Sequence, residues 1–508
     1  MPQSRRSLAG VALAALALAA GVGGLVVHSS ARNRPLRIAR GGDLVSLDPL
    51  LLESTTMFTV SNVFEGLVRR GRNMNIEPAL ALRWTIPDDR SWLFELRPGV
   101  TFHDGTPLTA VEVKAAFDRV RNDPEAPGKQ LLVNILSVEV TGEHSLRFTT
   151  RKPDPLLLQR LSLFRVPRGT TTREVAAHPV GTGPYRVTRW SRGGSVELEA
   201  FEGYWDGEAS TRRVEILPMP IEMRLAALSR GELDVAVVPA EAFESNPNPS
   251  ISLIRQVSLS RMFLWMCGMA RHKPHDALAD RRVRKAVALH LDRTALSEEL
   301  VGDRSVAATQ LVPRTIFGFV PGLEAPHADT AAARQLLAQA GWPSGFEAPL
   351  IYPAESTLSE RTAQAVSRAL FEIGIKTELR AVKAEEVLAA FGGQASGFLV
   401  SLWTFDDGDA GSFLRDCVRS RDEAGALGLF NPGFSDAGID AAIDASLGLI
   451  DDRARLERYQ GLMRRAAEED PAVPLFDQVV VVGLAPGLRW QPRPDGLILA
   501  VDVSRPSQ

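Results

Sequence analysis

One stretch of the chain, residues 81–120, constrains the fold more than any other. Trp92, Phe94 and Leu96 occupy every second position, which predicts a strand with one buried face. Two glycine-containing turns follow, and Thr109 is then placed to cap a helix. A strand, two turns and a capped helix in close succession predict mixed α and β structure. The helix has apolar side chains at helical spacing, namely Val113, Ala116, Phe117 and Val120.

Length and charge limit the classes of protein to consider. With 508 residues, the chain is too long for a single hydrophobic core, so two or more lobes are expected. Its formal net charge of −3 gives no electrostatic reason to bind nucleic acid or an anionic membrane surface. We therefore expect no nucleic-acid partner.

The sequence contains no motif of a catalytic or cofactor-binding type. HExxH, GxSxG, Walker and GxGxxG patterns are all missing, so we expect neither an enzyme nor a cofactor. The eight histidines are scattered, and the closest pair, His272 and His275, lies in a basic loop typical of solvated chain. Asp406, Asp407 and Asp409 lack the alternating spacing of a calcium loop. No resident metal is expected.

The same stretch resembles the signature of a known family. It reads W-x-F-x-L-R-x-G-V from Trp92 and F-x-D-G-x-P-x-T-A from Phe102. This order resembles the family 5 bacterial solute-binding proteins, the oligopeptide, dipeptide and nickel receptors of ABC importers. One departure is Glu112, where that family usually has Asp. Further segments that resemble family elements are Val180–Tyr185, Phe201–Trp205, Leu228–Val235, Asp280–Arg293, Thr330–Trp342 and Arg453–Phe476.

The resemblance implies an α/β, bilobal fold like that of periplasmic binding proteins of type II, class C, with an extra satellite domain. Lobe I would combine residues 35–65, 181–262 and 479–508. The satellite domain would be 66–180, and lobe II would be 263–478. The chain would then cross between the lobes twice, and two crossing strands form a hinge that permits closure around a ligand.

The best candidate for a binding site is an apolar strand that runs into an acidic loop. Carboxylates beside a large indole suit an ammonium group. In peptide-binding members of the resembled family, an Asp three residues after a Trp pairs with the ligand's α-amino group, and Asp406 stands at that spacing from Trp403. Ser401 and Thr404 belong to the same site, where the strand would offer main-chain groups to a peptide. The alternative is an acidic surface turn that caps the next helix, and Ala410 stands where the family commonly has Pro.

A second candidate lies between a predicted turn at Pro49 and a predicted helix that reaches Leu67. It consists of Glu53, Ser54 and Thr55. In oligopeptide receptors the matching loop places an acid and main-chain groups on the facing side of the cleft, so the resemblance implies ligand contacts here. The alternative is that Glu53 stands at the start of the helix, where the helix dipole favours a carboxylate.

The amino-terminal residues predict export. A basic pair at 5–6 precedes an uncharged apolar run at 8–27, which makes residues 1–31 a signal peptide or a signal anchor, with a Sec or twin-arginine route. No cysteine follows the run, so a lipoprotein is not expected. In an exported protein Cys267 and Cys417 would be able to form one disulfide; two separate buried thiols are the alternative.

The residues and the resemblance together predict a monomeric, non-enzymatic substrate-binding component of an ABC importer. It would act in the periplasm or at the outer face of the cytoplasmic membrane. A peptide or similar small molecule would be captured in the cleft and delivered to a permease with its ATPase. Two alternatives stay open: a non-peptide ligand such as a nickel chelate, haem or an oligosaccharide, and a membrane-anchored ligand sensor.

Overall fold

The structure is a computed structural model that describes residues 34–246, 248–267, 275–389, 397–422 and 427–505. The predicted signal segment, 1–31, and His272 lie outside these ranges. Within them, no helix combines the length and the apolar character needed to cross a membrane.

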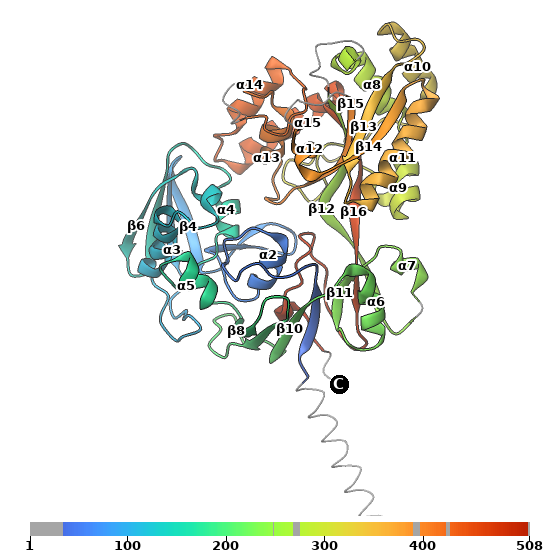
Figure 1. Cartoon of the computed structure of the whole chain (residues 1–508). Helices are drawn as coiled ribbons and strands as arrows, with labels where there is room; N and C mark the ends of the chain where they lie inside the picture. The colour runs from blue at the N-terminus through green and yellow to red at the C-terminus, as the bar shows by residue number, and fades with distance from the viewer. Residues whose placement is uncertain (1–33, 247, 268–274, 390–396, 423–426, 506–508) are drawn as a thin grey trace, which may run out of the picture.

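In the described chain, ten strands form one sheet that extends through both halves of the molecule (Figure 1). Its two long central strands, β12 and β16, run from one half to the other. They therefore provide the hydrogen-bonded connection between two lobes. The order of the sheet is β14 (Lys376–Val382), β13 (Glu347–Pro353), β15 (Gly397–Thr404), β12 (Ser252–Cys267), β16 (Ala472–Leu484), β11 (Val235–Val238), β1 (Leu36–Arg40), β10 (Arg213–Pro218), β9 (Val196–Ala200) and β8 (Tyr185–Trp190).

The first lobe is built from segments near both ends of the chain. Strand β1, which the alternation at residues 36–40 predicts, pairs in parallel with β10 and β11. Its side chains Leu36 and Ile38 are buried in a core that also contains Tyr185 and Ile216. The helices of this lobe are α2 (Ser54–Val60), α6 (Ile221–Ser229) and α7 (Ala242–Ser245).

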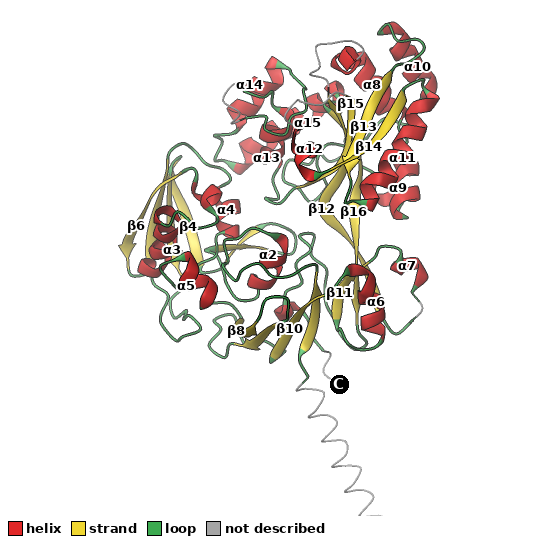
Figure 2. Cartoon of the chain, viewed as in Figure 1, coloured by secondary structure: helices red, strands yellow, loops and turns green. Residues whose placement is uncertain are grey.

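A smaller body stands beside the first lobe and has its own sheet (Figure 2). The strand and helix predicted here are confirmed: Trp92, Phe94 and Leu96 are at most 2% exposed, and Thr109 caps α3. The Thr109 hydroxyl accepts from the Val111 amide, and the Glu112 carboxylate accepts from the Thr109 amide at 3.0 Å. The elements are β4 (Ala81–Asp88), β5 (Ser91–Leu96), β6 (Ile135–Gly142), β7 (Ser145–Thr150), α3 (Ala110–Asn122), α4 (Leu157–Leu163), α5 (Thr172–Ala177) and the adjoining hairpin of β2 (Val68–Arg70) and β3 (Ile76–Pro78).

The second lobe places helices on both faces of its part of the sheet (Figure 2). Side chains of β12 alternate between the two faces: Leu264 and Met266 enter one core, and Phe263 and Trp265 enter the other. A strand buried on both faces reads as an unbroken apolar run, as residues 262–267 of β12 do. The helices are α8 (Arg281–His290), α9 (Arg293–Val301), α10 (Thr330–Gln339), α11 (Thr357–Glu372), α12 (Ala384–Ala389), α13 (Ala410–Phe413), α14 (Ala437–Ser446) and α15 (Asp452–Glu469).

The helix predicted to reach Leu67 ends earlier, at Val60. The carbonyl oxygens of Asn62 and Val63 accept instead from the amides of Tyr185, at 3.2 Å, and Gly183, at 3.0 Å. This pairing needs glycine, because a Cβ on Gly181 would lie 2.2 Å from the Val63 carbonyl oxygen. The glycine-rich turn therefore stops the helix and ties it to β8.

The second lobe also touches the smaller body that stands beside the first lobe, away from the connecting strands. Met74, in the turn between β2 and β3, has a φ of 68° and packs into the second lobe's core with Phe405. A Cβ on Gly408 would lie 3.7 Å from the Met74 carbonyl oxygen. Further along, Arg455 on α15 donates to the carbonyl of Pro155 at 3.2 Å. The structure thus has the smaller body and the second lobe in contact beside a cavity that lies between the lobes.

Candidate functional site

A cavity of about 1050 Å³ lies between the two lobes. On one side its walls come from α2 and the loop at residues 493–502 of the first lobe and from the β2–β3 hairpin of the adjoining smaller body. On the other side they come from Ser258–Ser260 of β12 and from the end of β15. Of the residues that the sequence analysis assigned to a ligand site, Ser54, Thr404 and Asp406 line this cavity. A wall from each lobe makes it the best candidate for a ligand site.

Asp406 is the free carboxylate of the acidic loop after β15. Asp409 caps α13, accepting from the Gly411 amide at 2.7 Å, and Asp407 accepts from the Ser412 hydroxyl. The alternative given in the sequence analysis, an acidic turn at the start of the next helix, therefore describes Asp407 and Asp409. Asp406 is exposed to the cavity and forms no ion pair with any residue in the described ranges.

The surroundings of Asp406 disfavour its charge. The surrounding protein removes water from Asp406 and so raises its pKa. The positive charge of Arg70 acts to lower this pKa, and the negative charge of Asp407 acts to raise it. An ammonium group brought beside this carboxylate would favour the ionised form. The site thus offers a partly desolvated acid to a cation.

The other residues of the first predicted site support the loop. Ser401 is buried and accepts from the indole Nε1 of Trp265 at 3.0 Å. Trp403 is half-buried and packs edge-on against Phe413, with ring centroids 6.0 Å apart. Thr404 shares a hydrogen bond of 2.8 Å with Ser260. In the described structure, Ser401 and Trp403 are not among the residues that line the cavity, so direct ligand contacts for them stay predictions.

The second predicted site lies at the start of α2. The carboxylate of Glu53 accepts from the amides of Thr55, at 2.8 Å, and Thr56, at 2.9 Å, so Glu53 is the helix cap that the alternative described. These hydrogen bonds lower the pKa of Glu53 against the effect of burial, which is the largest single influence and raises it. Ser54 lines the cavity beside it. A ligand role for Glu53 or Thr55 stays a prediction.

A second acid of the cavity lining, Glu65, anchors the first lobe to its neighbouring segments. Glu65 accepts hydrogen bonds from the Trp205 indole at 2.9 Å, the Thr182 hydroxyl at 2.9 Å and the Tyr204 hydroxyl at 3.1 Å. Burial raises the pKa of Glu65 to about 7, although all three donors act to lower it. These partners belong to the segments Val180–Tyr185 and Phe201–Trp205, both of which resemble family elements. Their hydrogen bonds to Glu65 show what these two segments do in the fold.

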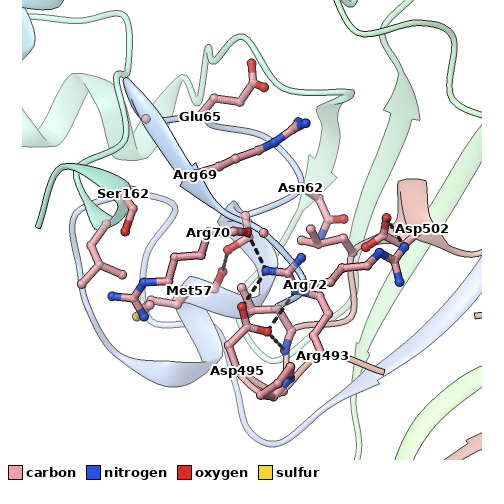
Figure 3. Close-up of a pocket in the computed structure, with 18 of the residues that line it drawn as sticks. Met57, Asn62, Glu65, Arg69, Arg70, Arg72, Ser162, Arg493, Asp495 and Asp502 are labelled. Carbon is pink, nitrogen blue, oxygen red and sulfur yellow. Dashed lines mark hydrogen bonds and ion pairs between the residues drawn. The ribbon is translucent and has the colours of Figure 1, made fainter. Parts of the chain in front are cut away.

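The sequence analysis missed the arginines of the cavity. Five arginines line it, from the β2–β3 hairpin, from the segment after α4 and from the loop before the carboxyl end of the described chain (Figure 3). No short motif joins them, because they lie far apart in the sequence and meet only through the fold. They are Arg69, Arg70, Arg72, Arg165 and Arg493.

The cysteines and histidines offer no metal site in the described ranges, where no group of three or more His, Cys, Asp or Glu side chains could hold an ion. Cys267 and Cys417 are separate buried thiols, so the disulfide alternative does not describe this structure. Burial raises the pKa of Cys267 to about 12. The thiol therefore stays protonated and serves as a small apolar side chain.

Comparisons with known proteins agree with this architecture. The chain matches the family model of bacterial extracellular solute-binding proteins, family 5 (middle), over residues 75–425. The glutathione-binding protein GsiB of Salmonella typhi is 27% identical over 489 residues, which cover 92% of this chain and 93% of that protein.

Two solved structures carry the same fold. NikA from Brucella suis, in complex with Fe(III)-EDTA, has a TM-score of 0.81 at 23% identity and covers 93% of this chain and 100% of its own. DppA from Helicobacter pylori, in complex with the peptide STSA, has a TM-score of 0.72 at 23% identity and covers 93% and 98%. These similarities confirm the predicted α/β bilobal fold of a periplasmic binding protein.

Proposed function

The chain belongs to the bacterial extracellular solute-binding proteins of family 5, and from this premise we propose that its cleft captures a peptide-like solute by the solute's ammonium group. Proteins of this family bind small molecules or peptides and work with ABC transporters. The chain is accordingly the extracytoplasmic substrate-binding component of such a transporter.

The observation that carries the proposed ligand chemistry is the position of Asp406. It is exposed to the cavity between the lobes, while Asp407 and Asp409 beside it bind to residues of α13 and Asp409 also pairs with Arg455. A charge-assisted hydrogen bond to a carboxylate is about twice as strong as a neutral one, and more so where water is scarce. An α-ammonium group is therefore a chemically matched partner for this residue.

Relatives suggest which peptides to test first. The Salmonella typhi relative is named for glutathione, and the Helicobacter pylori structure contains the peptide STSA. Both ligands carry a free ammonium group. Small peptides are therefore the leading class, with a metal chelate such as the Fe(III)-EDTA bound to the Brucella suis protein as the alternative.

The proposal includes how the protein is placed and how it moves. It would be exported through its residues 1–31, act as a monomer and carry no enzymatic activity. Residues 35–65, 181–262 and 479–508 would form one lobe, 66–180 the satellite domain and 263–478 the other lobe. Ligand contacts that exist only in the closed form would stabilise closure, and a permease would recognise that form.

The test is the binding of glutathione and of trialanine to the purified protein by isothermal titration calorimetry. Asp406→Asn should weaken the peptide that binds by at least about tenfold, because the charge on the acceptor is lost. Asp407→Asn is the matched control, because it removes the same charge from the next residue. The side chain of Asp407 already accepts a hydrogen bond from Ser412. Unchanged affinity of Asp406→Asn, or a wild-type protein that binds neither peptide, would contradict the proposal.

A further inference from the structure

Most of the charged groups that line the cavity are already paired with one another. Arg72 and Asp502 are 2.8 Å apart, and Arg493 and Asp495 are 2.7 Å apart (Figure 3). Such pairs neutralise each other and leave little charge for a ligand. Arg69 pairs with two carboxylates, because it lies 3.0 Å from Asp206 and 3.6 Å from Glu77.

Two arginines of the cavity have no carboxylate partner among the described residues. Arg70, the last residue of β2, is half-buried, and its Nε and Nη2 are buried without a hydrogen-bond acceptor. Arg165, in the segment after α4, is 7% exposed. Its Nη2 donates to the Ser61 hydroxyl at 2.7 Å, but its Nη1 is buried and has no acceptor.

The two guanidinium groups disfavour each other's charge. Burial, and then the positive charge of Arg70, lower the pKa of Arg165 to about 10. Burial likewise lowers the pKa of Arg70, although the carboxylates of Asp407, Asp406 and Asp495 act against it. Neither Asp406 nor Asp407 forms an ion pair with Arg70 within the described chain. Buried cations without a counter-charge are costly to maintain, which is a reason to expect an anion here.

We propose that Arg70 and Arg165 form a carboxylate-binding subsite on the satellite-domain wall of the cavity that Asp406 lines from the second lobe. This proposal rests on the proposed capture of an ammonium group by Asp406. Four charged groups that line the cavity have no ion-pair partner in the described chain, namely Arg70, Arg165, Glu65 and Asp406. Glu65 is held by three hydrogen bonds from its own neighbours, so two positive charges and one negative charge remain for a ligand, which matches a solute with one ammonium and two carboxylates. The preferred class is therefore a small peptide with an acidic side chain or a second carboxyl group.

The planar guanidinium suits this role. It presents its donors in a fork that matches the two oxygens of a carboxylate, so one arginine binds one carboxylate in two hydrogen bonds. Ser61 already orients one nitrogen of Arg165 and leaves another without an acceptor. The buried position also excludes competing water, which strengthens the interaction.

The test compares two peptides that differ by one charge, Ala-Glu-Ala and Ala-Gln-Ala, by titration calorimetry with the full-length protein. The wild type should bind Ala-Glu-Ala about tenfold more tightly. Arg165→Met and, separately, Arg70→Met should reduce this preference to within about twofold. Arg72→Met removes the same charge from an arginine that already has a partner, Asp502, and should keep the preference.

Failure of this proposal can be told apart from failure of peptide capture. If the wild type binds both peptides equally well, peptide capture stands and the carboxylate subsite is overturned. If it binds neither peptide, citrate serves as a probe that has no ammonium group. Thermal stabilisation by citrate that Arg165→Met and Arg70→Met abolish would support the subsite, and no stabilisation of the wild type would overturn it.

Discussion

Arg261 on β12 and Asp477 on β16 face each other where the two connecting strands leave one lobe for the other. The Arg261 Nε lies 2.7 Å from one oxygen of Asp477, and Nη2 lies 3.0 Å from the other. Both residues are nearly buried, and Arg261 also donates to the carbonyl of Gln310. The register between the strands shifts on either side of this pair, between Val257 and Arg261 and between Met262 and Phe263.

We expect Asp477→Asn to destabilise the protein by about 3 to 5 kcal/mol, because it leaves the buried Arg261 without its counter-charge. Denaturation in urea, followed by tryptophan fluorescence, measures the change. Arg83→Gln breaks an exposed pair with Glu95 and should cost less than about 1 kcal/mol. A loss for Asp477→Asn no greater than that of Arg83→Gln would show that the pair is not needed for stability.

His103 should make stability fall in mild acid. Its Nδ1 accepts from the Gly181 amide at 3.3 Å and its Nε2 donates to the Gly183 carbonyl at 3.0 Å, an arrangement that requires the neutral ring. Burial lowers the pKa of His103 to about 4, from 6.5 in an unfolded chain. Between these values the unfolded chain binds a proton that the folded one does not, so the contribution is complete above pH 6.5 and is lost as the pH falls towards 4.

The slope from one such group is at most about 1.4 kcal/mol per pH unit. Urea denaturation of the wild type and of His103→Asn, at pH 7 and at pH 5, tests this expectation. The variant should be less stable at pH 7, and the difference between the two proteins should shrink at pH 5. A difference that is the same at both values would contradict the neutral-ring assignment.

Met74 should favour the closed arrangement of the lobes. Met74→Ala keeps the backbone cost of a positive φ but removes the side chain from the second lobe's core. Burying a methionine side chain contributes about 1.5 to 3 kcal/mol, so the closed-to-open ratio should fall by about tenfold or more. Small-angle scattering without ligand would report a larger radius of gyration. Met223→Ala, at an exposed methionine, should leave the radius unchanged, and an unchanged radius for Met74→Ala would contradict the prediction.

Local patterns predicted the local structure well. The two-residue period at Trp92, Phe94 and Leu96 and the helix cap at Thr109 depend on neighbours along the chain, and each appears in the structure as expected. The part that Glu112 plays in that cap was not predicted. The helix end at Val60 was mispredicted because its cause is distant. The carbonyl oxygens of residues 62–63 are taken by a turn more than a hundred positions later, which no local pattern reveals.

The site was predictable only where it rests on a local motif. Asp406 could be singled out because a strand, an indole and an acidic loop are adjacent in the sequence. Sequence alone could not separate it from Asp409, which caps a helix and has a buried ion pair with Arg455. Arg70 and Arg165 carry no motif, and what distinguishes them from the other arginines that line the cavity is the absence of an ion pair with a carboxylate in the described fold.

Asp406 and the two arginines, Arg70 and Arg165, line the cavity from different parts of the chain, and this affects which compounds can close the protein. A compound that presents only one kind of charge would sit on a single wall and leave the facing wall unsatisfied. It could occupy the protein without holding its halves together. The protein would then discriminate between compounds when its lobes close. Two compounds of similar affinity could differ widely in how often they produce the closed form that delivers a ligand to the permease.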